Sequence, residues 1–105
     1  MKVVFICGSA EPGKNGVGDY SRRFCSALND QGVAAEILSL NDKDIKKNVS
    51  EIQENDGNLI KVKRIPISAG FRQRLDWTLR HLKEVQPDWI SLQYVPYSFD
   101  LKGIP

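Results

Sequence analysis

The sequence of 105 residues is poor in cysteine and contains no long apolar run. Its two cysteines, Cys7 and Cys25, are too few for a disulfide scaffold and lack the spacing of a metal site, so we expect buried free thiols in a reducing cytosol. No stretch approaches the ~20 apolar residues that cross a bilayer. Positive and negative residues nearly cancel, 15 against 13, and the formal net charge of +2 does not indicate a nucleic-acid partner.

The remaining composition is that of one soluble domain. Hydrophobic residues make up 41% and charged residues 27%, and 105 residues leave room for a single core. The first residues, MKVVFICGSAEPG, contain only a short apolar stretch, which lacks the central region of a signal peptide. The polar run Glu-Pro-Gly-Lys comes soon after this stretch. We therefore expect a cytoplasmic protein whose first residues form a strand.

The first forty residues have the pattern of a strand, a glycine-rich loop, a helix and a second strand. Lys2–Cys7 is a continuous β-branched and aromatic run, which is typical of a strand buried on both faces. The loop GSAEPGKNGVG follows, and from Val17 apolar residues recur at helical spacing until Gly32, a good helix stop. Residues 33–40, VAAEILSL, predict the second strand. Such a βαβ unit is right-handed and makes a parallel sheet.

The rest of the chain predicts one helix and two strands. Residues 41–58 are polar and charged, with a weak helical period, and predict either a short surface helix or a loop. Residues 59–67, LIKVKRIPI, predict an exposed strand at the sheet edge, where lysine and proline discourage mispairing. Residues 71–85 predict a helix with Ser68 as its N-cap. Residues 89–94, WISLQY, predict the last strand.

These elements predict an α/β fold: a Rossmann-like, doubly wound parallel sheet of about four strands in the order 3-2-1-4. The strand order reverses direction between the first and the last strand. Ligands of such sheets bind outside the carboxyl ends of the strands at that point. The glycine loop after Cys7 and the segment 93–97 after the last strand both fall there, so they are the candidate binding segments.

The glycine loop partly matches two nucleotide-binding motifs. GSAEPGKN matches the spacing of a phosphate-binding P-loop but has Asn15 where Ser or Thr must coordinate Mg²⁺. GVGDYS begins like a dinucleotide fingerprint but ends in Ser21, not Gly. Glu36, in the second strand, is roughly where such a fold would place a ribose-binding acid. The loop can also serve only as a turn between strand and helix.

Two segments in the right order resemble a known family. The run NGVGDYSRRFCSALNDQG at residues 15–32 and the run PDWISLQY at residues 87–94 are similar to segments of the N-terminal domain of GT-B glycosyltransferases of the GT4-like type, glycosyltransferase group 1. The resemblance as a whole extends over about two-thirds of the chain, and residues 41–70 carry none of it. Asn15 departs from the family, which often has glycine there.

The resemblance implies a site at the carboxyl edge of the sheet and no metal, cofactor or catalytic residue in this chain. In that family the N-terminal domain mostly holds the acceptor, and its glycine loop lies near the donor diphosphate. The residues that it would assign to the donor diphosphate are Gly16, Val17 and Gly18. Those that it would assign to the acceptor are Asp19, Tyr20, Gln93 and Tyr94.

The implied partners are a sugar-nucleotide donor, a sugar or lipid-linked acceptor, and a C-terminal domain that lies beyond residue 105. The resemblance thus predicts a truncated domain that is inactive alone and that self-associates through apolar surface. Two other functions stay open. One is a Rossmann-type domain that binds NAD or a nucleoside triphosphate, and the other is a non-catalytic α/β module that binds a protein partner.

Overall fold

The computed structural model describes residues 1–13 and 16–93, with only the backbone of Val17. Along the chain it forms β1 (Lys2–Cys7), α1 (Gly16–Asp30), β2 (Ala34–Asp42), β3 (Val49–Asn55), β4 (Asn58–Pro66), α2 (Phe71–Val85) and β5 (Trp89–Leu92). Tyr94 and the rest of the predicted segment 93–97 beyond Gln93 lie outside the described residues.

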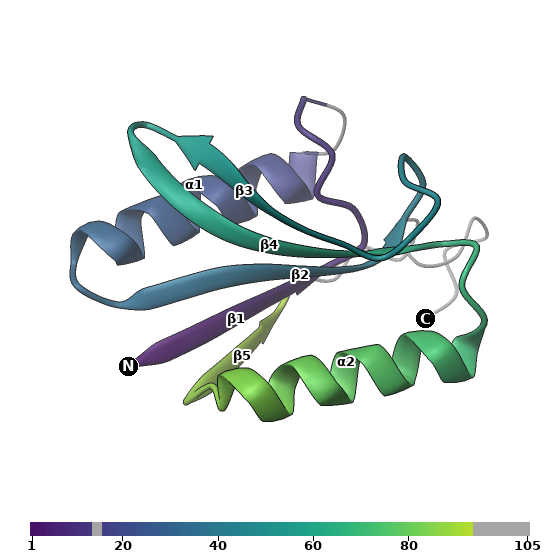
Figure 1. Cartoon of the computed structure of the whole chain (residues 1–105). Helices are drawn as coiled ribbons and strands as arrows, with labels where there is room; N and C mark the ends of the chain where they lie inside the picture. Colours follow the sequence, from purple (N-terminus) through teal and green to yellow (C-terminus); the bar gives the residue numbers. More distant parts are fainter. Residues whose placement is uncertain (14–15, 94–105) are drawn as a thin grey trace.

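The strands form one sheet in the order β3-β4-β2-β1-β5. β1 pairs in parallel with β2 and β5, β2 pairs in parallel with β4, and only β3 is antiparallel to its neighbour. Figure 1 shows α1 and α2 on opposite faces of this sheet. The α/β class predicted from the sequence is therefore confirmed.

The predicted number and order of strands are wrong because of β3. Residues 41–58, predicted as a helix or a loop, contain this strand, which pairs along the outer side of β4. The predicted edge strand 59–67 is consequently internal, between β3 and β2. Without β3 the remaining strands follow one another as β4-β2-β1-β5. The lysines of β4 therefore do not protect an edge.

A two-residue turn makes the β3–β4 hairpin possible. Asp56 and Gly57 both have positive φ, 50° and 81°, and the strands close on the pair Asn55 and Asn58. Positive φ at both central positions is the geometry whose twist matches the flanking strands, and Asp-Gly is among the pairs that adopt it most readily. The turn thus specifies the register of the hairpin.

Each face of the sheet has its own apolar core, because alternate residues of β1, β2 and β4 point to opposite sides. The core on the α1 side contains Val3, Phe5, Cys7, Ala10, Cys25, Ala35, Ile37, Ile60 and Val62. The core on the α2 side contains Val4, Ile6, Leu38, Ile65 and Ala69. Both cysteines are buried and free, as predicted.

The helix α2 lies on the sheet without burying any residue of its own completely. Trp77, Leu82 and Val85 pack against the core on its side, whereas Phe71 remains 72% exposed. Its N-cap is Gly70 and not Ser68 as predicted, because a turn closed by the Ala69 amide on the Pro66 carbonyl delays the start of the helix. Within the described part of the chain, no helix is long and apolar enough to cross a membrane.

A pair of isoleucines tests the assignment of the core. Ile37 of β2 is fully buried in the core on the α1 side, whereas Ile52 of β3 is 56% exposed. We expect Ile37→Ala to lower the free energy of unfolding by about 2–5 kcal/mol, the range for a large-to-small change in a packed core. Ile52→Ala should change it by less than ~0.5 kcal/mol. Urea unfolding followed by circular dichroism measures both, and similar values for the two variants would contradict this core.

Candidate functional site

The carboxyl ends of the parallel strands meet at one edge of the sheet, and hydrogen bonds continue there beyond the strands. The Asn41 amide donates to the Gly8 carbonyl over 2.9 Å, and the Gln93 amide donates to the Ile6 carbonyl over 2.7 Å. The start of the glycine loop therefore lies between the end of β2 and the residue that follows β5. This is the edge at which the sequence predicted a binding site.

A buried ion pair lies at this edge. The Arg64 guanidinium donates to Asp42 through two nitrogens, Nε to Oδ2 over 2.8 Å and Nη2 to Oδ1 over 2.9 Å. The side chain of Asp42 is fully buried, and that of Arg64 is 6% exposed. Arg64 also bonds Glu51 of β3, over 2.8 Å, and Glu11 of the glycine loop. The guanidinium of one residue of β4 thus links β2, β3 and the glycine loop.

The electrostatics of Asp42 follow from these contacts. Burial alone would raise the pKa of Asp42, but the hydrogen bonds from Arg64 and from the amides of Ala10 and Asp44 outweigh it and hold this pKa below its ordinary value. The same pairing raises the pKa of Arg64, whose charge is permanent in any case. The pair is therefore ionised throughout the neutral range.

The loop residue Ala10 is held by buried side chains at both its amide and its carbonyl. Its amide donates to Asp42 Oδ2 over 3.1 Å. Its carbonyl accepts from Arg22 Nη1 over 2.8 Å and from Gln53 Nε2 over 3.0 Å. Arg22 and Gln53 are also bonded to each other, over 2.7 Å. Because every partner is buried, the path of the loop is specified by side chains of α1, β2 and β3.

Gly18 is required where the loop passes the first turn of α1. A Cβ atom built on Gly18 would lie 2.7 Å from the Ser9 carbonyl oxygen, closer than real Cβ atoms come. Asp19, the next residue, pairs with Arg22 and accepts a hydrogen bond from the Gly13 amide over 3.4 Å. The loop and the helix therefore form one closely packed corner.

The structure places the predicted site residues that it describes at the start of α1 and directly after β5. Gly16, Gly18 and Asp19 belong to the loop–helix corner, and Gln93 lies beside the end of β1, where its Nε2 donates to Ser91 Oγ over 2.7 Å. Tyr20 follows Asp19 in α1. It is 49% exposed and contacts Phe24, at 5.8 Å between ring centroids, along the helix.

Sequence reasoning missed the residues that hold the site together. Asp42, Arg64 and Gln53 are all buried, and none was identified as a candidate. The available signal was Arg64, a charged residue in an otherwise apolar end of a strand, since a buried arginine needs a carboxylate partner. Its partner is 22 residues away along the chain and cannot be read from spacing.

His81 of α2 has a specific partner on the sheet. Its Nε2 lies 2.6 Å from Glu36 Oε1, and the two side chains are only 17% and 15% exposed. The pair joins α2 to β2 on the face opposite α1. Glu36 therefore does not lie at the carboxyl edge, where a ribose-binding acid would be needed.

The corner is rich in hydrogen-bond acceptors. Four carboxylates surround two guanidiniums: Glu11, Asp19, Asp42 and Glu51 around Arg22 and Arg64. Carboxylate oxygens of Glu11, Asp42 and Asp44 lie within 4.8 Å of one another, as metal ligands do. Arg64, however, already supplies the positive charge to two of these carboxylates, so the group does not fit a metal ion. The carboxylate of Asp19, which is 45% exposed, suits hydroxyl donors instead.

The two cysteines are not nucleophiles at neutral pH. Burial raises the pKa of Cys7 and of Cys25 to about 12, and the neighbouring charge of Asp42 adds to the effect at Cys7. Thiols with such pKa values stay protonated and unreactive.

Acid should weaken the fold through Asp42. Because its pKa in the folded protein lies below the unfolded value near 3.9, its stabilisation is present above pH ~4 and is lost as the pH falls through the folded pKa. We expect Asp42→Asn to lower the free energy of unfolding by about 3–5 kcal/mol at pH 7, since Arg64 loses its buried partner. The difference from the parent should shrink below pH ~4.

The matched control is Asp76→Asn. Asp76 pairs with Arg80 over 3.1 Å on the surface of α2, where its side chain is 52% exposed. That change should cost less than ~1 kcal/mol. Chemical unfolding at several pH values measures both variants, and a pH-independent effect of Asp42→Asn would contradict the buried pair.

Two glycines test the packing of the corner. Gly18→Ala should lower the free energy of unfolding by about 1–3 kcal/mol, because its methyl group would collide with the Ser9 carbonyl. Gly16→Ala is the control, since a Cβ there meets no described atom within 4 Å and alanine favours a helix. Thermal unfolding measures the stability of both variants. Equal stability of the two would contradict the close approach of Gly18 to the Ser9 carbonyl.

Comparison with known proteins adds no identification. No protein-family model, curated protein or solved structure matches the chain. A function can therefore be inferred only from the sequence segments and the geometry of this edge.

Proposed function

We propose that the chain is the acceptor-side, Rossmann-like N-terminal domain of a GT-B glycosyltransferase of the GT4-like type. The enzyme would move a sugar from a sugar nucleotide to a sugar or lipid-linked acceptor in the cytoplasm. This domain would be inactive without the C-terminal domain that binds most of the donor. The support is the resemblance of two sequence segments, together with the position of the start of the first and of Gln93 in the second at the carboxyl edge of the sheet.

The observation that carries the proposal is the corner between the glycine loop and α1. Gly18 allows the loop to approach the helix closely, and buried side chains hold Ala10 in place. A binding loop that is organised before its ligand arrives loses little entropy on binding. The corner also lies at the carboxyl edge, the side on which open α/β sheets bind ligands.

The start of α1 is the place for the donor diphosphate. Gly16, Val17 and Gly18 form the first turn of this helix, where the helix dipole favours negative charge. In sugar transfer, negative charge grows on the diphosphate as the glycosidic bond breaks. Backbone dipoles aimed at that charge stabilise the transition state more than the ground state.

The carboxylates of the corner suit the acceptor. The side chain of Asp19 is 45% exposed, so its carboxylate can accept hydrogen bonds from sugar hydroxyls. Gln93 lies at the same edge, and beside the N–H that bonds Ser91 its side chain has a second N–H donor and a carbonyl acceptor. Under this proposal Tyr20 and Tyr94 extend the acceptor site, Tyr20 from the exposed side of α1.

Nucleotide binding by the chain itself tests the proposal. We expect UDP, GDP or ADP at millimolar concentration to shift the backbone amide signals of residues 16–19 in NMR spectra of the labelled chain, and NAD to bind no better. Gly18→Ala should weaken this binding about tenfold or more, equivalent to ~1.4 kcal/mol. Gly70→Ala is the control, because a Cβ at Gly70 meets no described atom within 4 Å and Gly70 lies at the start of α2.

Three outcomes would overturn the proposal. Preferred, saturable binding of NAD at the loop would favour a dinucleotide-binding domain. The absence of any shift with the three diphosphates would remove the donor site and favour a partner-binding module. Repeated turnover of a labelled sugar nucleotide by the chain alone would contradict the need for a second domain.

A further inference from the structure

The face of the sheet that carries α2 is only partly covered. The core beneath α2 is built from β1, β2 and the end of β4, through Val4, Ile6, Leu38 and Ile65. On the same face, the first part of β4 and the whole of β3 have no helix over them (Figure 1). Lys61 and Lys63 point to this side, because the alternate residues Ile60 and Val62 point into the core on the α1 side.

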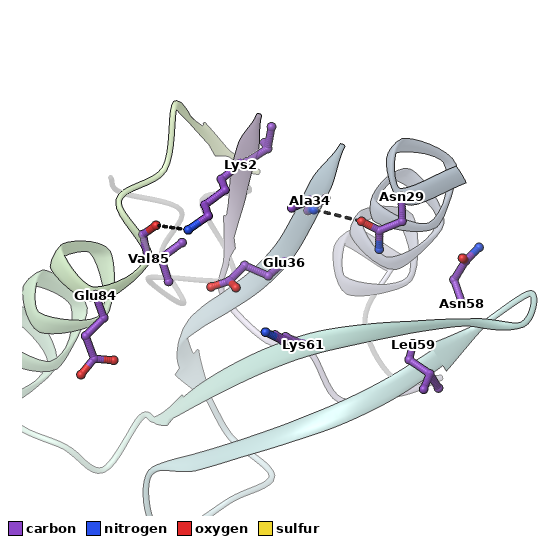
Figure 2. A pocket seen from close by; sticks show the side chains of 11 residues that line it. Lys2, Asn29, Ala34, Glu36, Asn58, Leu59, Lys61, Glu84 and Val85 are labelled. Atoms are coloured by element: carbon purple, nitrogen blue, oxygen red, sulfur yellow. Dashed lines mark hydrogen bonds between the residues drawn. The ribbon is translucent and has the colours of Figure 1, made fainter. Parts of the chain in front are cut away.

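A groove runs along this face between α2 and the β3–β4 hairpin. One cavity of about 300 Å³ lies between residues 50–52 of β3, Lys61 and Lys63 of β4, Glu36 of β2 and His81 of α2. A second, of about 250 Å³, shares Lys63 and His81 with it. A third, of about 480 Å³, shares Glu36 and Lys61 with the first and opens at the amino ends of the strands. Figure 2 shows Glu36 of β2 in this third cavity, between Glu84 of α2 and Lys61 of the hairpin.

Among the charged groups of the groove, Lys61 and Lys63 are available to a ligand, whereas Lys2 Nζ donates to the Val85 carbonyl over 3.2 Å. Glu36 is held by His81 over 2.6 Å, and Glu51 is held by Arg64 over 2.8 Å. Lys61 and Lys63 have no carboxylate partner among the described residues, and Lys63 donates only to the Ser50 hydroxyl, over 3.3 Å. Glu84 is the one carboxylate lining these cavities that has no described cation. Two lysines two residues apart on a strand lie about 7 Å apart, close enough to share one phosphate.

Two further groups in the groove point to a ligand that carries hydroxyls. The Oδ1 atom of Asn48 is buried and has no hydrogen-bond partner among the described residues. A buried acceptor without a donor is costly, and a ligand hydroxyl would satisfy it. Trp77 lines the same cavity as Asn48, and an indole ring offers a flat apolar surface to the CH groups of a sugar ring.

We propose that this groove binds a phosphorylated monosaccharide. Its phosphate lies between Lys61 and Lys63, one hydroxyl donates to Asn48 Oδ1, and its ring packs on Trp77. The pair of Glu36 and His81 forms the wall of the groove and positions the helix against the sheet. The site lies on a face of the sheet, away from the glycine loop, and does not depend on the function proposed for that loop.

Binding of glucose 6-phosphate to the isotope-labelled chain tests this site. We expect saturable shifts of the amides of Lys61, Lys63 and His81 and of the Trp77 indole N–H, with unchanged signals from the glycine loop. Inorganic phosphate should bind the same residues more weakly, and glucose alone more weakly still. The double variant Lys61→Gln/Lys63→Gln should lose about tenfold or more in affinity, the scale of one charge-assisted hydrogen bond. The control is Lys83→Gln. Lys83 lines neither of the two smaller cavities, so this variant should bind glucose 6-phosphate like the parent.

Asn48→Ala separates a sugar phosphate from a bare anion. It should lower the affinity for glucose 6-phosphate toward that for inorganic phosphate, with the contact to Trp77 retained, and leave the affinity for phosphate itself unchanged. Equal affinities for the two probes in the parent would overturn the assignment of a sugar ligand. Shifts that do not saturate, or that the double lysine variant does not reduce, would overturn the site. Failure of nucleotide binding at the glycine loop would leave these results unaffected.

Discussion

The carboxyl edge of this sheet depends on the contact between Arg64 and Asp42. Both groups are charged and almost completely removed from water, so either one alone would be very costly. Together they satisfy most of each other's hydrogen-bonding capacity, and the remaining donors of Arg64 bind Glu51 and Glu11. Three segments far apart in the sequence therefore reach this edge in one arrangement: the glycine loop, the end of β2 and the hairpin.

This arrangement has a consequence for what the loop can bind. The Ala10 peptide groups are already occupied by Asp42, Arg22 and Gln53, so the first half of the loop is a structural support and offers little to a ligand. Under the proposed function, the binding of the donor therefore falls to the start of α1. In that arrangement a diphosphate would meet the amide end of α1, whereas hydroxyl groups would contact the exposed carboxylate of Asp19.

The sequence predicts the parts of the fold that depend on local periodicity. β1 and α2 have the predicted bounds, and α1 begins within one residue of Val17, because apolar residues recur along each with the spacing of its own structure. The hairpin was missed because Ile45, Val49 and Ile52 suggested a helical period. The turn Asp56-Gly57 was the stronger signal, since both residues adopt the positive φ that a two-residue hairpin needs. The contact between Arg64 and Asp42 could not be predicted, because it depends on which strands become neighbours.

β4 shows how one strand serves two different surfaces. In the sequence LIKVKRIPI, Ile60, Val62 and Arg64 face α1, and Lys61 and Lys63 face the other side. Lysine alternating with apolar residues predicted an edge strand, yet β4 is internal. The reason is the width of a helix: at about 10 Å it covers roughly two strands spaced ~4.8 Å apart, so a single helix leaves part of a five-stranded face open. The lysines of β4 therefore lie on an uncovered face, where the groove forms. The sequence indicated correctly that β4 has an exposed side, but the cause is the missing helix and not a position at the sheet edge.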